Sequence, residues 1–229
     1  MDPMAQVIAA GRPGLPPEAV QAMCRFGQAL LEKNRVMNLT AITDPAQVDR
    51  LHFLDSLTLL DLADFRGKQV IDVGCGGGFP GVPLKIACPE MELTLLDSLG
   101  KRMDWLAQIL PGLGVEARCV TARAEEAVAG CRESYDYAVS RAVARLNVLC
   151  ELCLPYVQVG GTFLAMKGAA AQAEVEQARG AIRRLGGEVA RLAAFPRVGQ
   201  EHAVVVIRKI RPTPAQFPRR FAKIKQQPL

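Results

Sequence analysis

The sequence predicts an α/β fold, in which a mostly parallel sheet carries helices on both faces and ends in an antiparallel strand. Apolar strand-like segments alternate with helical segments between residues 69 and 209, as in a parallel sheet with crossover helices. A glycine-rich turn directly follows the first strand, as at the ligand-binding edge of such sheets. Only residues 195–202 join the last two strands. A parallel crossover needs more residues, so this pair is antiparallel.

Seven strands are expected, and most are short apolar runs that suit a buried sheet. They are residues 69–73, 93–96, 115–121, 135–140, 162–166, 188–194 and 203–209. The helices between them are expected at 81–88, 101–110, 144–154 and 170–185. Gly160 and Gly161 are interpreted as a turn into the fifth strand.

Two helices precede the sheet and are expected to form a cap in front of it. The first starts at Pro16 and fades near Asn34, and the second runs from about Pro45 to Asp64 with apolar residues at helical spacing. Residues 1–15 are rich in Ala, Gly and Pro and are expected to be poorly ordered. The chain is therefore divided into a helical cap (1–64), a core domain (65–210) and a C-terminal tail (211–229).

The bulk composition fits one domain with an appendage. The chain has 229 residues, of which 50% are hydrophobic, enough for a sizeable core. No apolar run reaches about 18 residues, which argues against a membrane span, and the N-terminus does not resemble a signal peptide. The seven cysteines are odd in number and irregularly spaced, which favours reduced thiols in a cytoplasm. We expect a monomer.

The positive charge is concentrated at the C-terminus. Seven basic and no acidic residues lie from Arg208 to the end, and the rest of the chain has 21 basic and 23 acidic residues. Such a cluster is typical of a protein that contacts a polyanion; the alternative is a solvated tail. The candidate RNA-binding residues of the tail are Arg211, Arg219, Arg220, Lys223 and Lys225.

Two nucleotide-binding patterns overlap in the glycine-rich turn. Gly76-x-Gly78-x-x-Gly81 satisfies a dinucleotide pattern, but its glycines start after the strand has ended at Gly74. In the other frame Gly74, Gly76 and Gly78 directly follow the strand that contains Asp72. This is the arrangement of Rossmann-like class I methyltransferases that use S-adenosylmethionine (SAM), whose last strand is antiparallel. We therefore prefer SAM to a nicotinamide cofactor.

Two acidic residues at strand ends complete the expected cofactor site. Asp97 ends the second strand, where a carboxylate can accept both ribose hydroxyls of an adenosine; it could also cap the next helix. Glu125 follows the third strand and could accept the exocyclic amine of adenine, with a nearby backbone N–H on a ring nitrogen. Its neighbour Glu126 is as well explained as a first-turn helix carboxylate.

Several motifs together resemble one family. Residues 72–84 read Asp-Val-Gly-Cys-Gly-Gly-Gly-Phe-Pro-Gly-Val-Pro-Leu, and residues 140–142 read Ser-Arg-Ala. With Asn38-Leu-Thr40, His52-Phe-Leu-Asp-Ser56, Leu95-Leu-Asp-Ser98, Ala165-Met-Lys-Gly168 and Val206-Ile-Arg-Lys209, they resemble the bacterial RsmG (GidB) family from about residue 20 onward. That family makes 7-methylguanosine in 16S ribosomal RNA, at guanine 527 in the usual ribosomal numbering. The resemblance implies this activity, SAM as cofactor, and 16S rRNA or the small ribosomal subunit as partner.

The resemblance also implies individual roles. Gly74, Phe79, Ala124, Glu125 and Arg141 match the positions at which the family binds SAM. Guanine N7 has a free lone pair and carries no hydrogen, so no general base is expected. Catalysis should rest on positioning, with Arg141 holding the SAM carboxylate or a phosphate.

Three further residues are candidates for RNA contact. Arg123 and Lys167 lie at strand ends and His52 on the cap helix, where each could contact RNA; Lys167 could equally be a solvated lysine, and His52 a buried structural residue. Cys150 and Cys153 have the spacing of half a metal site, but no second pair accompanies them and we expect no metal. Two alternatives stay open: a class I methyltransferase with another substrate, such as another RNA, a small molecule or a protein, and a non-catalytic RNA-binding module.

Overall fold

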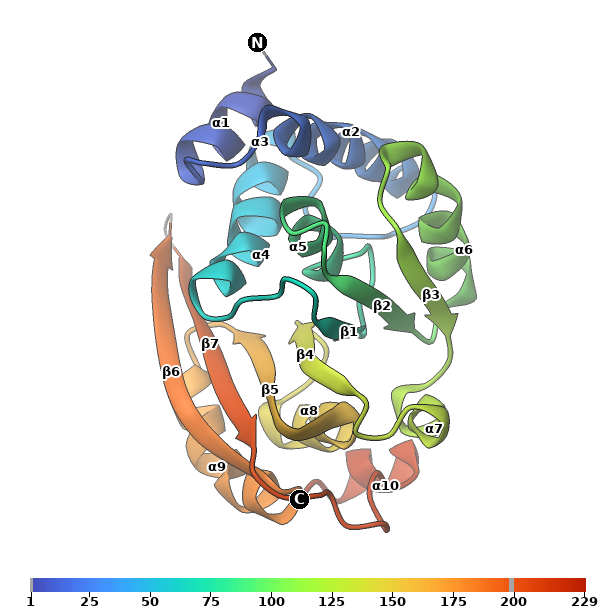
Figure 1. Ribbon diagram of the computed structural model, residues 1–229, viewed down its shortest axis with the longest axis vertical. Coiled ribbons are helices and arrows are strands. Elements are labelled where there is room, and N and C mark those ends of the chain that lie inside the picture. The colour runs from blue at the N-terminus through green and yellow to red at the C-terminus, as the bar shows by residue number, and fades with distance from the viewer. Residues whose placement is uncertain (1, 198–199) are drawn as a thin grey trace.

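The computed structural model describes residues 2–197 and 200–229, and a seven-stranded sheet runs through the centre of this part of the chain (Figure 1). The strand order is β3-β2-β1-β4-β5-β7-β6. The strands are β1 Gln69–Val73, β2 Glu92–Asp97, β3 Ala117–Thr121, β4 Tyr135–Arg141, β5 Val157–Lys167, β6 Gly187–Arg197 and β7 Gln200–Lys209.

The predicted direction of the strands is confirmed. β3, β2, β1, β4 and β5 pair in parallel, whereas β7 lies antiparallel between β5 and β6. The largest difference in a strand boundary is at β5, which begins at Val157, five residues before the expected start, so Gly160 and Gly161 lie inside a strand. The register with β4 jumps there, from Tyr135 opposite Val157 to Tyr137 opposite Thr162. The two glycines therefore mark an irregularity of the strand and not a turn.

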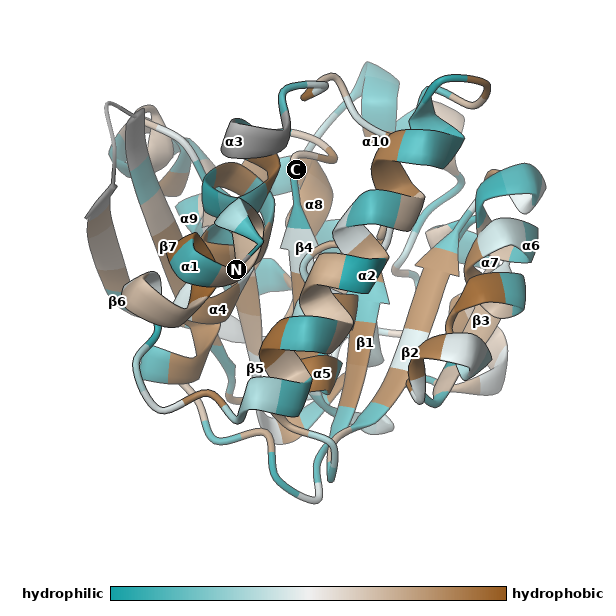
Figure 2. Cartoon of the chain, turned by 90° about the horizontal axis from the view of Figure 1, so that it is seen from above, coloured by the Kyte–Doolittle hydropathy of each residue, from teal (hydrophilic) through white to brown (hydrophobic). Residues whose placement is uncertain are grey.

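Helices cover both faces of the sheet and leave two apolar cores. On one face α5 (Gly81–Ala87) and α6 (Gly100–Ile109) pack with the N-terminal helices; on the other lie α7 (Ala124–Ala127), α8 (Leu146–Cys153), α9 (Ala171–Arg184) and α10 (Phe221–Gln226) (Figure 1). Figure 2 shows brown central strands behind helices that carry both brown and teal residues. Helices such as α6, α8 and α9 thus turn an apolar side toward the cores beside the sheet.

The N-terminus is helical, contrary to the expected poor order of residues 1–15. Helix α1 spans Pro3–Gly11; the Asp2 side chain accepts a hydrogen bond from the Met4 N–H (3.0 Å), and Pro3 occupies the first turn. These are regular start signals of a helix. Met4 and Ile8 are buried against α2 (Pro17–Asn34) and its neighbours, so packing orders this segment.

The second cap helix is less regular than its apolar period suggests. Residues 45–61 form α3 (Pro45–Val48), a π-helical segment (Asp49–Leu54), α4 (Asp55–Leu57) and a 3-10 turn (Thr58–Asp61). A π-helical turn shifts the side chains that follow relative to the preceding face. This segment carries His52 and Asp55, both buried, toward the C-terminal edge of the sheet.

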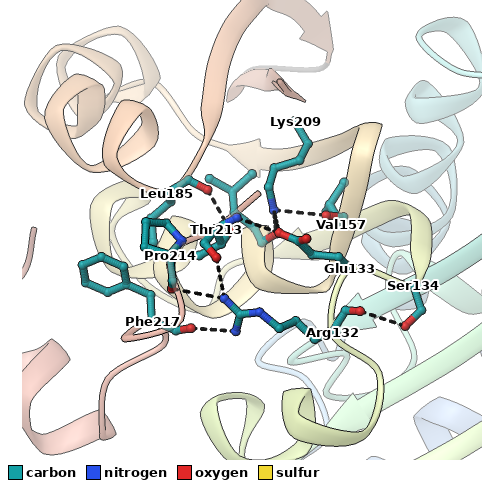
Figure 3. Close-up of polar contacts among 10 residues, drawn as sticks. Arg132, Glu133, Ser134, Val157, Leu185, Lys209, Thr213, Pro214 and Phe217 are labelled. Atoms are coloured by element: carbon teal, nitrogen blue, oxygen red, sulfur yellow. Dashed lines mark hydrogen bonds and ion pairs between the residues drawn. The ribbon is translucent and has the colours of Figure 1, made fainter. Parts of the chain in front are cut away.

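The C-terminal segment folds back onto the sheet's second face. Figure 3 shows Arg132 donating to the carbonyl oxygens of Phe217 (2.7 Å), Thr213 (2.7 Å) and Pro214 (3.1 Å). Phe217 and Thr213 are buried, and the Thr213 N–H donates to Glu133 at 2.6 Å. The stretch expected to be a tail is therefore part of the packed structure.

Candidate functional site

A cavity of about 820 Å³ opens at the C-terminal ends of the parallel strands. Its walls come from the loop after α2, the π-helical segment, the glycine-rich turn, the ends of β2, β3 and β4, and α10. This is the edge where open α/β sheets bind ligands. It gathers residues from nearly the whole length of the chain.

The glycine-rich turn forms the floor of this cavity. Gly74, Gly76 and Gly78 have φ of +73°, +55° and +95°, in the left-handed region that side chains disfavour. A Cβ on Gly74 would lie 2.5 Å from the Val143 side chain. At Gly74 and Gly76, which line the cavity, the loop thus exposes backbone where a side chain would close the floor; Gly78 is not part of the lining.

Asp97 is held in place beside this loop. One carboxylate oxygen accepts from the Gly76 N–H (3.0 Å) and the other from the Leu99 N–H (2.9 Å). Each carboxylate oxygen can accept more than one hydrogen bond. The carboxylate therefore ties the strand end to the loop and keeps acceptor capacity for ligand hydroxyls.

Ala124 and Glu125 line the next part of the wall, and Phe221 closes it from α10. The Tyr156 hydroxyl donates to the Ala124 carbonyl oxygen and fixes the start of α7. The Arg123 guanidinium lies over the Phe221 ring, 5.3 Å from its centroid. Phe221 carries no motif signal in the sequence, and only the fold of the C-terminal segment reveals it.

Arg141 is the centre of a polar cluster on the opposite wall. Its guanidinium donates to the Leu51 carbonyl oxygen (3.0 Å), to Asp55 (3.3 Å) and to Nδ1 of His52 (2.9 Å). Asp55 also pairs with His202 of β7 (3.0 Å). Burial, followed by the charge of Arg141, lowers the pKa of His52 to about 3, so this histidine is neutral. Sequence reasoning did not single out His202, whose only signal is that it is one of two histidines.

An aromatic ring joins the cluster to the glycine-rich turn. The His52 ring stacks on Phe79 with centroids 4.7 Å apart, and the Arg141 guanidinium lies 5.2 Å from the Phe79 centroid. Phe79 is itself buried among Phe26 and Phe53 of the cap. The cap, the turn and the end of β4 thus hold one another in fixed positions.

Asp72 lies beneath the turn and is fully buried. One oxygen accepts from the Gly81 N–H at 2.8 Å, and within the described part of the chain the other has no protein hydrogen-bond partner. Burial raises the pKa of Asp72 to about 7, although the hydrogen bond from Gly81 and the charge of Arg141 oppose this shift. Asp72 thus anchors the first turn of α5 more than it supplies charge.

Comparison with known proteins identifies the family. Residues 19–204 match the family model described as rRNA small subunit methyltransferase G. The chain belongs to this family. The ribosomal RNA small subunit methyltransferase G of Alkaliphilus metalliredigens is 44% identical over 220 residues, covering 92% of this chain and 90% of the relative. That of Halalkalibacterium halodurans is 46% identical over 210 residues, covering 89% and 88%.

Solved structures show the same fold at low identity. TYW2 of M. jannaschii, in complex with AdoMet, has a TM-score of 0.56 at 10% identity and covers 68% of this chain and 75% of that chain. A rRNA methylase from Streptococcus thermophilus has a TM-score of 0.50 at 17% identity, covering 69% and 95%. The predicted fold, a Rossmann-like class I methyltransferase, is confirmed for this member of the methyltransferase G family.

The structure divides the basic candidates into residues that pair with a carboxylate of the protein and residues that are exposed to solvent. Lys167 pairs with Glu174 (2.7 Å) and donates to the Ala144 carbonyl oxygen (2.8 Å), with 9% of its side chain exposed. Arg219 pairs with the fully buried Glu151 at 2.6 Å. Both therefore have intramolecular partners that were not expected. The exposed candidates are Arg123, Arg211, Arg220, Lys223 and Lys225.

All seven cysteines are free, and burial raises the pKa of Cys75, Cys150 and Cys153. Across residues 2–197 and 200–229, no group of three or more His, Cys, Asp or Glu side chains could hold a metal ion. None of the helices in this part of the chain is long and apolar enough to cross a membrane.

Proposed function

We propose that the protein transfers a methyl group from SAM to N7 of a guanine in 16S ribosomal RNA. The observation that carries this proposal is the cavity in which the glycine-rich turn, Asp97, Glu125 and Arg141 converge. Membership of the rRNA small subunit methyltransferase G family supports the substrate. The position, guanine 527, follows from the family resemblance alone.

The hydrogen-bond acceptors of the cavity fit the adenosine part of SAM. Asp97 has acceptor capacity for two ribose hydroxyls, and Glu125 lies on the same wall for an adenine amine. Gly74 and Gly76 line the cavity and keep side chains out of its floor, whereas Gly78 lies outside the lining, with Val82, Leu106 and Phe26 where its Cβ would be. When bound, SAM supplies an electrophilic methyl group on a sulfonium.

The protein's own residues act by positioning. Arg141 has five N–H groups, and three hydrogen bonds to Leu51, Asp55 and His52 leave two for a carboxylate or phosphate. Guanine N7 carries no proton, so no side chain needs to remove one. His52 is kept neutral by burial and by the charge of Arg141. Alignment of the base with the methyl group supplies much of the rate.

RNA binding is assigned to the exposed cations near the cavity mouth. Arg123 and Arg220 line a second depression of about 490 Å³ that shares Phe221 with the cofactor cavity, and Lys223 and Lys225 are exposed on α10. Arg211 is also exposed but donates to the Arg183 carbonyl oxygen at 3.2 Å. A single chain carries this whole surface, which fits a monomer organised as cap (1–64), catalytic domain (65–210) and C-terminal segment (211–229). A ribosomal substrate and free thiols fit the bacterial cytoplasm.

The proposal is tested with purified protein, radiolabelled SAM, and 16S rRNA or 30S subunits from cells that lack the protein. We expect transfer of one methyl group per acceptor, recovered as 7-methylguanosine by mass spectrometry of the digested RNA. The naked RNA and the 30S particle are assayed side by side to identify the substrate form. Transfer to neither, or methylation at an atom other than N7, would refute the proposal.

A further inference from the structure

Thr40 ends a chain of hydrogen bonds that starts at Arg141 and crosses His52. Thr40 belongs to the loop after α2, and all three residues line the cavity. The chain runs from Arg141 to Nδ1 of His52 (2.9 Å) and from Nε2 of His52 to Oγ1 of Thr40 (2.7 Å). Neither the sequence motifs nor the proposed function gives Thr40 a role.

Arg141 determines which nitrogen of His52 carries the proton. A guanidinium has donors and no acceptor, so Nδ1 of His52 must accept. The depressed pKa of His52 is consistent with this arrangement, since burial and the charge of Arg141 disfavour a second proton. The single ring proton is therefore on Nε2, which donates to Thr40.

The Thr40 oxygen consequently has both lone pairs occupied. It accepts from Nε2–H of His52 (2.7 Å) and from the Ile42 N–H (3.0 Å). A hydroxyl has two acceptor sites and one donor. Among residues 2–197 and 200–229 its O–H donates to no protein acceptor, so what remains for a ligand is a hydrogen-bond donor.

The loop that carries Thr40 is held rigidly. The Asn34 side chain accepts from the N–H groups of Leu39 (2.7 Å) and Thr40 (2.9 Å) and donates to the Thr40 carbonyl oxygen (3.0 Å). The stacking of His52 on Phe79 fixes the other end of the chain. A donor held in this way does not have to be ordered when a ligand binds.

We infer that the Thr40 hydroxyl is a specificity-determining donor for an acceptor oxygen of the bound ligands, either the methionine carboxylate of SAM or O6 of the target guanine. The inference rests on the proposed function. Because both lone pairs of Thr40 are occupied, it cannot accept from an amine at the same place. If the acceptor is the base, adenine, which presents an amine there, is disfavoured against guanine.

The first arm of the test measures cofactor binding by calorimetry in the parent, Thr40→Val and Thr40→Ser. The ligands are S-adenosylhomocysteine, which has the carboxylate, and methylthioadenosine, which lacks it. If the carboxylate is the acceptor, Thr40→Val raises the Kd of S-adenosylhomocysteine about tenfold and leaves the Kd of methylthioadenosine unchanged. Thr40→Ser, which keeps the hydroxyl, has the Kd values of the parent. Merely structural damage would weaken both ligands.

The second arm measures base recognition with reconstituted 30S subunits whose target position carries guanosine, inosine or 2-aminopurine ribonucleoside. All three have N7, and only the last lacks O6. If O6 is the acceptor, the parent and Thr40→Ser methylate guanosine and inosine alike and 2-aminopurine about tenfold more slowly, whereas Thr40→Val shows no preference.

The inference is overturned if Thr40→Val has the Kd values of the parent for both ligands and also the relative methylation rates of the parent on guanosine, inosine and 2-aminopurine. Thr40→Val also leaves two N–H donors unpaired; if it does not fold, Thr40→Ala, which leaves room for water, carries the same two comparisons. A parent enzyme that methylates no guanosine substrate would refute the proposed function, while the calorimetric arm would still decide whether Thr40 meets the cofactor.

Discussion

Arg219 offers a test of whether the C-terminal segment is a structural element or an RNA-binding tail. Its backbone N–H, Nε and Nη2 donate to Glu151 of α8 at 2.9, 2.8 and 2.6 Å. Glu151 is completely buried. Replacement of Arg219 by Ala leaves this carboxylate in the apolar core with one backbone donor.

The expected loss of stability can be estimated from this geometry. Removal of one partner of a buried ion pair costs about 3–5 kcal/mol. We take the lower end, about 3 kcal/mol, because 16% of the Arg219 side chain is exposed to solvent. For a chain of this size that corresponds to a decrease in Tm of about 6–12 °C.

Thermal unfolding of Arg219→Ala and Arg220→Ala provides the measurement and its control. Arg220 has the same charge one position later, and it is exposed, so its replacement should change stability by no more than about 0.5 kcal/mol. RNA binding should show the opposite ranking: Arg220→Ala reduces the salt slope by about one, and Arg219→Ala has little direct effect on it.

A second substitution at Glu151 isolates the cause. In the double variant Glu151→Gln, Arg219→Ala, the buried charge is absent and part of the lost stability should return. Equal Tm values for Arg219→Ala and Arg220→Ala would refute the reasoning. The same conclusion would follow if Arg219→Ala flattened the salt dependence of RNA binding without destabilising the fold.

Three further changes test the glycine-rich turn, the cavity wall and the polar cluster around Arg141. Gly78→Ala should cost about 1–3 kcal/mol, because φ is +95° and the added Cβ would lie 2.8 Å from the Val82 side chain. Gly112→Ala is the control: apart from its chain neighbours, no atom of residues 2–197 and 200–229 lies within 4 Å of the added Cβ, so this variant should be neutral in the same urea titration. Similar midpoints for the two variants would contradict this expectation. Phe221→Ala should raise the calorimetric Kd for SAM about tenfold, as expected for the loss of an aromatic contact with adenine, and Phe221→Tyr should not. An unaltered Kd for the alanine variant would show that Phe221 does not contact the adenine. His52 has a folded-state pKa of about 3 against 6.5 when unfolded, so its contribution to stability is complete above pH 6.5 and is lost as the pH falls toward 3. The free energy of unfolding of the parent, relative to His52→Gln, should therefore fall by about 1 kcal/mol for each pH unit between about 6 and 4, and parallel pH curves would argue against a buried neutral histidine.

The features that sequence reasoning predicted correctly depend on local patterns. The alternation of strands and helices, the turn that starts at Gly74, and the carboxylate of Asp97 can each be recognised within a short stretch. The antiparallel last strand followed from a connection of a few residues. In the structure the Asp97 carboxylate accepts hydrogen bonds from the Gly76 N–H of the turn and from the Leu99 N–H before the next helix. The two interpretations of Asp97, a ligand for ribose hydroxyls and a cap of the next helix, are therefore compatible.

The features that were missed depend on partners far apart in the chain. Arg219 and Glu151 are 68 positions apart, and Arg132 and Phe217 are 85 apart. Neither the charge of a segment nor its proline content indicates such a partner. The basic C-terminus therefore resembled a free tail, although two of its cations are buried or paired inside.

The N-terminal error has a different origin. Asp2 followed by Pro3 is a recognisable helix start, but the composition of residues 1–15 outweighed it. Thr40 and His52 each lie in a motif of the family, but no local signal indicated that the two side chains meet. Their relation depends on the π-helical segment that carries His52 and on the contact of its ring with Arg141, 89 positions away.

The basic residues that are paired inside the protein contribute little to RNA binding by charge. Lys209 and Arg219 are neutralised by Glu133 and Glu151 inside the protein, so they add little to the field that an approaching polyanion meets. The exposed Arg123 lies instead over the ring of Phe221, at the boundary between the two depressions, and the exposed Arg220 lines the second depression. Phosphate contacts at this boundary would orient the RNA toward the cavity without occupying it, which leaves recognition of the base to the polar groups of the opposite wall.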